Sequence, residues 1–451
     1  MHDQHLPLKA REAAMKALGA YRRNKTWPEM SITSLIDNRD MSSRDMALTV
    51  QMFKGVLQNT ALCDYYLSYF SSRDLKKIEP RVLDILRLSI YQIIFLSRVP
   101  NSAAVNEGVA LAKKYSNNQA AGFVNAILRK VSRSAENSSL PDISGELPKR
   151  LSVKYSHPEW IIKEFCGLLG PDGTEALLSA NNAPDIPVTA QVNTLLSDTN
   201  SVLAALEYSG VEADRHDWLD NCIELRSAGS IDSLEPFIKG HIYIQDAAAR
   251  LAVTACSPKS GDFLIDGCAA PGGKSFSAAV DMKNLGRIMA FDIRADKLRY
   301  VTEGAKRLGI DIIEAYEKDA AAEDNTGRFT EKADIVLADV PCSGLGIIRK
   351  RPDIRYKSEN DINGLPEIQK KILNGLSKKV KPGGVLLYST CTFLRRENED
   401  VIEAFLRENG DFSPECFILP SLGYISAGMI TLWPHIHRTD GFFICKLRKA
   451  E

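Results

Sequence analysis

Long hydrophobic runs are absent from this 451-residue chain. Its longest mainly apolar stretch, from Ile90 to Leu96, is far shorter than the ~18 residues that a membrane-spanning helix needs. The first residues, Met1 to His5, are polar or charged, without the apolar segment of a secretory signal. We therefore expect a cytoplasmic protein without a membrane partner.

Paired cysteine motifs are absent as well. The nine cysteines are odd in number and never stand in a C-x-x-C pair, which argues against a disulfide framework and against a zinc ribbon. No metal site is therefore predicted. We expect reduced thiols, most of which, such as Cys63, Cys166 and Cys445, stand among apolar neighbours and belong to the core.

Net charge is the third absence, because 57 basic residues balance 57 acidic ones. The distribution is nevertheless uneven. Residues 1–133 hold 20 Lys and Arg against 11 Asp and Glu, a net charge of +9, and the remainder carries −9. Such an asymmetry indicates that the N-terminal part faces a polyanion, the alternative being a solvated helical surface.

Length and patterning predict several domains, since single cores stop growing near ~250 to 300 residues. Apolar residues recur at helical spacing from Leu8 onward, which predicts an all-α bundle over residues 1–135. The Ser-, Pro- and Gly-rich stretch that follows predicts a linker over residues 136–150. A helix expected from Tyr155 to Gly170 and two strand patterns then predict a small α+β module over residues 151–240.

Short β-rich runs alternate with amphipathic helices in the remaining residues, 241–451. This alternation predicts a parallel sheet with crossover helices, hence a Rossmann-like α/β domain. Ligands of such sheets bind at the carboxyl ends of the strands, so the residues that follow each strand are candidate site residues. The expected strands are Phe263 to Ile265, Arg287 to Phe291, Ile335 to Ala338 and Val385 to Tyr388.

The first of these strands runs into a turn of small residues, Asp-Gly-Cys-Ala-Ala-Pro-Gly-Gly-Lys at 266–274. Gly267, Gly272 and Gly273 would let the backbone approach a ligand where Cβ atoms would prevent it. The pattern is neither the G-x-G-x-x-G turn nor, in register, a phosphate loop. It predicts a nucleotide-like cofactor. The cofactor-binding residues expected here are Cys268, Ala269, Ala270, Pro271, Gly272, Gly273 and Lys274.

Acidic residues follow the next two strands. Asp292 ends the strand that comes one βαβ step after the turn, where a carboxylate can accept hydrogen bonds from ribose hydroxyls. Asp319 follows a further, weak strand and is predicted to contact the adenine amine. Capping of the next helix is the alternative role for each.

Thiols follow the last two strands. Asp339, Pro341 and Cys342 come after one strand, and Cys391 comes after the other, in Ser-Thr-Cys-Thr at 389–392. Cytosine C5 accepts a methyl group only after a thiolate has added to C6 and made the ring enamine-like. A carboxyl at the N3 edge would stabilise the adduct, and a base must later remove the C5 proton. Two thiols and a carboxyl at neighbouring strand ends suit this chemistry.

Together these motifs resemble the RNA cytosine-5 methyltransferases over essentially the whole chain. Further matching motifs are Asp-Val-Pro-Cys-Ser-Gly at 339–344, Glu397-Asn-Glu399, Gln245-Asp246 and Asp440-Gly-Phe-Phe443. The resemblance implies S-adenosylmethionine as the cofactor, which Asp339 also approaches, and Lys274 at the junction of cofactor and active site. It further implies a monomer.

By the same resemblance, Cys391 is the nucleophile, Cys342 assists product release, and Asp339 contacts the cytosine edge. In DNA cytosine-5 methyltransferases the nucleophile is instead the cysteine of the Pro-Cys pair, here Cys342. Position alone leaves that alternative open, but the second cysteine is the mark of the RNA family. A third hypothesis is an RNA-bound assembly factor with an inert catalytic half.

The implied substrate is a specific cytidine in small-subunit ribosomal RNA, within a structured hairpin because the base must be unpaired or flipped. The N-terminal helices resemble the antitermination factor NusB, in Pro100 to Lys113 and Gly122 to Lys130, which implies RNA binding. The run Arg349-Lys-Arg351, with Arg355 and Lys357, is predicted to neutralise phosphates near the target base. One departure is Gln191, where the family usually has Arg, so an RNA contact is absent or displaced.

Overall fold

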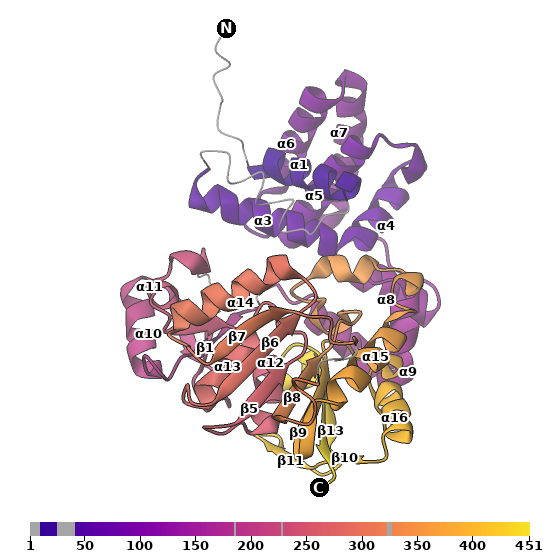
Figure 1. Cartoon of the computed structure of the whole chain (residues 1–451). Coiled ribbons are helices and arrows are strands. Elements are labelled where there is room, and N and C mark those ends of the chain that lie inside the picture. The colour runs from indigo at the N-terminus through magenta and orange to yellow at the C-terminus, as the bar shows by residue number, and fades with distance from the viewer. Residues whose placement is uncertain (1–9, 25–40, 185, 227–228, 323–326) are drawn as a thin grey trace. The chain divides into compact units, whose positions relative to one another are not determined.

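The computed structural model describes residues 10–24, 41–184, 186–226, 229–322 and 327–451. The helical pattern expected from Leu8 therefore begins just outside the described residues. Contacts within the chain define two compact units, which are coloured by residue number in Figure 1. Unit 1 holds Met1–Asn182 and Arg351–Tyr356, and unit 2 holds Ala183–Lys350 and Lys357–Glu451.

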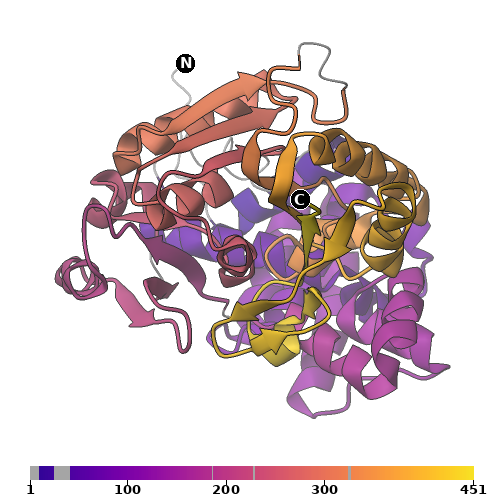
Figure 2. The ribbon, with the colours of Figure 1, turned by 60° about the horizontal axis from the view of Figure 1, so that its bottom comes forward.

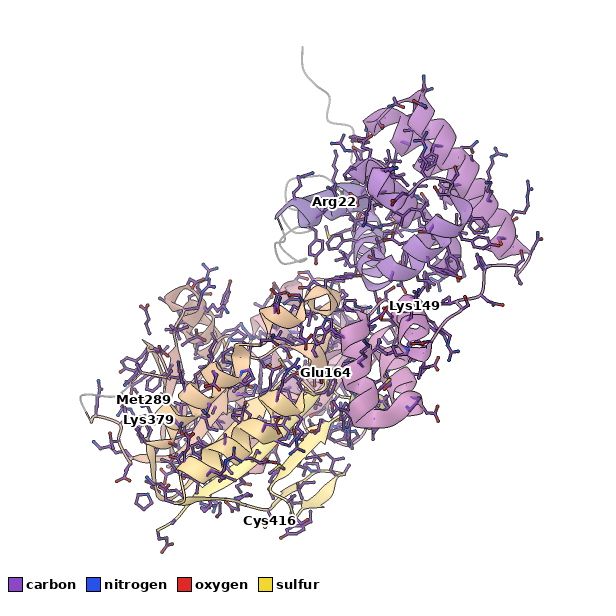
Figure 3. The ribbon with its side chains drawn as sticks, turned by 90° about the vertical axis from the view of Figure 1, so that its right-hand side faces the viewer. Arg22, Lys149, Glu164, Met289, Lys379 and Cys416 are labelled. Atoms are coloured by element: carbon purple, nitrogen blue, oxygen red, sulfur yellow. The ribbon has the colours of Figure 1, made fainter. Side chains whose placement is uncertain are left out.

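Unit 1 is helical in its described residues, as predicted. Alanine-rich α1 packs on α3 and α5, and one apolar core runs through α1 and α3 to α7. Arg22 of α1, labelled in Figure 3, pairs with the buried Asp84 of α5 at 3.1 Å. The elements are α1 (Ala10–Asn24), α3 (Ser43–Gln58), α4 (Thr60–Phe70), η1 (Leu75–Lys77), α5 (Pro80–Phe95), α6 (Asn101–Tyr115), α7 (Asn118–Glu136), α8 (Leu147–Tyr155), α9 (Glu159–Asn181) and η4 (Pro352–Tyr356).

Local chemistry shifts the helix boundaries in this unit. The helix predicted from Tyr155 starts only at Glu159, because Ser156 adopts a left-handed conformation (φ 53°) and Pro158 follows it. The same helix continues past a kink at Gly170 (φ 68°). The predicted linker, residues 136–150, contains the last residue of α7 and the first turn of α8. The domain boundaries proposed from the sequence stay a prediction.

A small antiparallel sheet opens unit 2 and confirms the α+β module. Its strand order is β2-β3-β1-β4, and α10 covers it through a separate core that includes Val192, Val202 and Ile223. Asp198 caps α10 by accepting from two backbone N–H groups. The elements are β1 (Val188–Val192), α10 (Thr199–Tyr208), β2 (Glu212–Arg215), β3 (Cys222–Arg226), η2 (Ile231–Ser233), α11 (Glu235–Ile238) and β4 (Ile242–Ile244).

The large sheet of unit 2 has the order β10-β14-β9-β8-β5-β6-β7, with β13 also on β14 (Figures 1 and 2). The strands from β9 to β7 are parallel, as predicted. Antiparallel β14 was not predicted. The strands are β5 (Phe263–Asp266), β6 (Arg287–Asp292), β7 (Ile313–Glu317), β8 (Ala333–Asp339), β9 (Val380–Thr390), β10 (Phe412–Pro414), β13 (Met429–Leu432) and β14 (Phe442–Lys449), besides the hairpin β11 (Phe417–Leu419) and β12 (Gly423–Ile425).

Alternation along the strands divides the apolar side chains between two cores. Leu264 and Leu337 face α12, α13 and α14, whereas Ile265, Val336 and Met289, the last labelled in Figure 3, face α15 and α16. With both faces buried, the carboxyl ends of the strands remain for ligands. The remaining elements are α12 (Ala247–Cys256), α13 (Gly273–Asp281), α14 (Ala295–Leu308), η3 (Leu345–Ile347), η5 (Glu359–Asp361), α15 (Leu365–Ser377), η6 (Arg395–Glu397), α16 (Glu399–Glu408) and α17 (Pro434–His437).

Candidate active site

The small-residue turn joins the end of β5 to the start of α13. Its backbone is held by the protein, since the Ala269 N–H donates to the Phe291 carbonyl at 2.8 Å and the Gly272 N–H to the Ala269 carbonyl at 2.7 Å. Asp266 lies buried beneath it and accepts from the Ser275 hydroxyl at 2.7 Å. Burial raises the pKa of Asp266 to about 6.

The glycines of this turn are required for a different reason than the sequence suggested. A Cβ on Gly267 would lie 2.4 Å from Leu376, and one on Gly272 (φ 116°) would lie 2.4 Å from the Phe276 ring. Gly273 has more room, with the side chain of Gln245 no nearer than 3.5 Å. Packing within the protein therefore requires the first two glycines, whereas only Gly273 remains for close approach of a ligand.

Carboxylates follow the two strands beyond the turn. Asp292, at the end of β6, accepts from the Ala270 N–H at 3.2 Å and the Arg294 N–H at 2.9 Å. Asp319 lies two residues past β7, is exposed and accepts from the Ala321 N–H at 2.9 Å. Both carboxylates keep lone pairs for further donors. Beside the turn, these acceptors fit the hydroxyl and amine donors of an adenosyl group.

The two predicted thiols meet at the neighbouring strand ends. The Sγ atoms of Cys342, after β8, and Cys391, after β9, lie 3.2 Å apart. The hydrogen bond with Cys391 raises the pKa of Cys342, and burial and the charges of Cys391 and Glu397 raise it further. The contact therefore brings the two sulfurs within hydrogen-bonding distance of each other, and either can be the donor.

Lys274 and Asp339 form an ion pair beside the thiols. The Lys274 Nζ lies 2.6 Å from an Asp339 carboxylate oxygen, and the Ser389 hydroxyl donates to the other oxygen at 2.8 Å. Burial lowers the pKa of Lys274, but the charges of Asp339, Asp266 and Cys391 together raise it above its usual value. Lys274 is therefore a fixed positive charge next to the thiol edge.

Buried polar side chains that were not predicted as site residues support the Pro-Cys turn. Glu397, a member of the Glu397-Asn-Glu399 motif, accepts from the Ser343 N–H at 2.9 Å and from Gln369 Nε2 at 2.8 Å. Gln369 also donates to the Pro341 carbonyl at 3.0 Å. Gln369 lies on α15, outside every motif, so no signal in the sequence pointed to it.

The phosphate-binding prediction for residues 349–357 is wrong for its first two members. Arg349 pairs with Asp440 at 2.7 Å, and Lys350 bridges Asp246 at 2.6 Å and Asp440 at 2.8 Å. Burial alone would raise the pKa of Asp246, but the charges of Lys350 and Arg349 lower it below its usual value. These ion pairs connect the loop after β8 to the motifs Gln245-Asp246 and Asp440-Gly. Lys357 donates to the Ser343 carbonyl at 2.7 Å.

Arg355 likewise contradicts the prediction, because its side chain is fully buried within unit 1. Its guanidinium donates to the Gln58 carbonyl at 2.7 Å, the Tyr155 carbonyl at 3.2 Å and the Asn182 side chain at 3.1 Å. Burial lowers the pKa of Arg355 to about 10. This arginine satisfies helix-end carbonyls and cannot reach a phosphate.

Two further sequence observations have structural counterparts. Gln191 is buried and donates to the Cys222 sulfur and the Gln245 carbonyl, so its amide serves packing in the small module. All nine cysteines are free, and Cys416, labelled in Figure 3, is exposed. Within the described ranges there is no His, Cys, Asp and Glu group suited to a metal ion, and none of their helices is long and apolar enough to cross a membrane.

The fold and this site define an S-adenosylmethionine-dependent methyltransferase, with helices on both faces of a mixed sheet and acceptors at the ends of β6 and β7. Comparison with known families sharpens this class. Residues 253–448 match the 16S rRNA methyltransferase RsmB/F model, residues 8–133 the NusB family, and residues 157–232 the ferredoxin-like domain of RsmF/B-like methyltransferases. The chain belongs to the 16S rRNA methyltransferase RsmB/F family.

Relatives align along nearly the whole chain. A protein of Bacillus subtilis named probable ribosomal RNA small subunit methyltransferase B is 36% identical, covering 97% of this chain and 98% of that protein. The solved structure of PH0851 is 28% identical, covers 99% of this chain and all of that one, and has a TM-score of 0.80. A methyltransferase homologue from Pyrococcus horikoshii is 29% identical over 66% of this chain and 97% of its own, with a TM-score of 0.56.

Proposed function

We propose that the protein methylates C5 of a specific cytidine in 16S ribosomal RNA, with Cys391 as the covalent nucleophile. Family membership supports the substrate class. The observation that carries the chemistry is the pair of sulfurs 3.2 Å apart at the ends of β8 and β9, beside the Lys274–Asp339 ion pair.

In this proposal S-adenosylmethionine supplies an electrophilic methyl group when it is bound. Asp292 accepts hydrogen bonds from its ribose hydroxyls and Asp319 from its adenine amine. The turn from Cys268 to Lys274, which also includes Ala269, Ala270, Pro271, Gly272 and Gly273, lies against it, and Asp339 is close to it. Carboxylates at successive strand ends beside a small-residue turn support these assignments.

The protein's own groups carry the remaining steps. The Cys391 thiolate forms a bond to C6 of the cytosine, while N3 takes up a proton from solvent and donates a hydrogen bond to Asp339; this proton returns to solvent when the adduct breaks down. C5 then has the electron density to accept a methyl group. Cys342 assists release by taking the C5 proton, after which the C5=C6 double bond forms and the Cys391 sulfur leaves.

The target base must leave its stack, which costs least in a loop, so the proposal includes a structured hairpin of the small-subunit RNA. The NusB-like helices of unit 1, where the net positive charge of residues 1–133 lies, support RNA binding by that part of the chain. The domain boundaries 1–135, 136–150, 151–240 and 241–451, a monomeric state and a cytoplasmic location complete the proposal.

The deciding experiment incubates wild type, Cys391→Ala and Cys342→Ala with labelled S-adenosylmethionine and small-subunit RNA. We expect Cys391→Ala to lose methyl transfer, by about four orders of magnitude or more, because the covalent pathway is lost. Cys342→Ala should instead accumulate a denaturant-stable protein–RNA adduct, since release is impaired.

Two other results have distinct meanings. If Cys342→Ala abolishes adduct formation and Cys391→Ala retains it, the nucleophile is Cys342, as in DNA enzymes. If wild type transfers no methyl group to any small-subunit RNA or precursor particle but still binds the RNA, the inert assembly factor is the better description.

A further inference from the structure

The two active-site thiols lie between opposite charges. On the Cys391 side, the Lys274 ammonium is paired with Asp339 and feels the charge of the Cys391 sulfur. On the Cys342 side, Glu397 accepts from the backbone N–H of Ser343, the next residue, at 2.9 Å, and its charge raises the pKa of Cys342. A nearby anion favours the protonated form of a thiol.

Glu397 is a buried carboxylate with unusually few donors. Its side chain is 0% exposed, one oxygen accepts from Ser343 and Gln369, and the other oxygen has no partner among the described residues. Burying a carboxylate without full compensation is costly, so such a group needs a reason. The hydrogen bonds from Gln369 to Glu397 and to the Pro341 carbonyl also fix the Pro-Cys turn.

We propose that Glu397, oriented by Gln369, is a positioning residue that keeps Cys342 as a protonated thiol and thereby leaves attack on the base to Cys391. The inference rests on the proposed function, because it explains how two adjacent thiols are given different roles. It assigns Glu397 and Gln369 a part in the reaction that the matched motif alone does not define.

Other charged groups around Cys342 do not supply this bias. Lys357 donates to the Ser343 carbonyl, and Asp339 is neutralised by Lys274. Tyr388 of β9 is buried, and its hydroxyl donates to the Glu397 carbonyl at 2.6 Å, with burial raising its pKa well above the usual value. Besides Cys391 itself, Glu397 is therefore the side chain whose charge raises the pKa of Cys342.

The bias also fits the order of events. While Cys391 is a thiolate, its hydrogen bond and charge hold the proton on Cys342 most strongly. Once the Cys391 sulfur is bonded to C6 it is neutral, so the largest influence on Cys342 disappears. Cys342 can then lose its proton to solvent and accept the proton from C5, which returns the C6–S electron pair to Cys391.

The test measures alkylation of Cys342 by iodoacetamide from pH 6 to 10.5 on the full-length protein, with the modified peptide quantified by mass spectrometry. Cys391→Ala provides the background, so that Cys342 reacts alone at the site. Glu397→Gln keeps the shape and the acceptor for Ser343 but removes the charge. We expect it to lower the midpoint of the alkylation profile by about one pH unit.

Two matched variants separate charge from structure. Glu399→Gln removes a carboxylate two residues away and should leave the midpoint unchanged. Gln369→Ala keeps the Glu397 charge but removes the donor that orients it, so it should slow methyl transfer several-fold in the Cys391-containing enzyme and lower the midpoint in the alanine background by less than Glu397→Gln does. A midpoint that stays in place in a folded Glu397→Gln variant would overturn the proposal.

A second measurement needs no Glu397 variant. In folded Cys391→Ala, Cys342 should be alkylated with a higher midpoint than in the same chain unfolded in guanidinium, with exposed Cys416 as internal reference. Equal midpoints would overturn the proposal even if Glu397→Gln failed to fold. Because the assay uses neither RNA nor S-adenosylmethionine, its failure is distinguishable from a failure of the proposed function.

Discussion

The two halves of the catalytic edge are held in different ways. At the ends of β8 and β9, Ser343, Gln369 and Glu397 are fully buried and bonded to one another around the thiols. At the ends of β6 and β7, Asp292 and Asp319 are partly or fully open and accept only from nearby backbone N–H groups.

This difference separates preorganisation from recognition. A nucleophile must be held within a fraction of an ångström of its productive position, which hydrogen bonds between buried side chains help to provide. A carboxylate that binds a soluble cofactor instead needs oxygens that still accept when the ligand arrives. Three changes at the ends of β5, β6 and β7 test this difference, because each should alter binding or stability without altering which thiol attacks.

Asp292→Ala should have the largest effect of the three. Loss of charge-assisted hydrogen bonds to two ribose hydroxyls, each worth about 1.5 kcal/mol, predicts a KM for S-adenosylmethionine raised ~100-fold. Methyl-transfer kinetics and the thermal shift caused by the cofactor both report this. Asp296→Ala, an exposed carboxylate on α14, is the matched control. An unchanged thermal shift in Asp292→Ala would remove the ribose assignment.

Asp319→Ala should have a smaller effect on the same measurements. A single hydrogen bond from the adenine amine contributes about 1 kcal/mol, which predicts a KM raised about five-fold with kcat unchanged. An effect equal to that of Asp292→Ala would mean that the roles of the two carboxylates are not as proposed. A kcat effect without a KM effect would place Asp319 outside the cofactor site.

Asp266→Asn tests the buried carboxyl under the turn through the pH dependence of the free energy of unfolding. The folded pKa of about 6 exceeds the ordinary value of 3.8, so the unfolded chain loses this proton first and stability falls as pH rises between these values. The asparagine variant escapes this loss. Its stability relative to wild type should therefore rise by about 3 kcal/mol between pH 3.5 and pH 7.

Thermal unfolding at a series of pH values measures this difference, with Asp311→Asn on the exposed surface as control. A difference between variant and wild type that stays constant across the series would show that Asp266 is not held protonated by burial.

Much of the site could be predicted because its signals are local. The turn at 266–274 and the strand before it are contiguous, and alternation of strands and helices implies that successive strand ends share one edge. Asp292, Asp319, Asp339, Cys342 and Cys391 accordingly lie after β6, β7, β8 and β9. The pairing of β14 with β9 joins residues that are 53 (Phe443 and Thr390) to 63 (Arg448 and Val385) positions apart, and the β-rich run alone did not reveal its antiparallel direction.

Periodicity and turn chemistry are encoded in neighbouring residues, so they sufficed to predict the helical N-terminal part, the parallel sheet and the strand-end positions of the reactive groups. The partners of the charged side chains, by contrast, follow from the tertiary fold. Lys350 and Arg355 look alike as basic residues in one loop, yet one bridges two aspartates and the other is buried among carbonyls. Burial and partners depend on segments distant in sequence, and the same holds for Glu397 and Gln369 beneath Cys342.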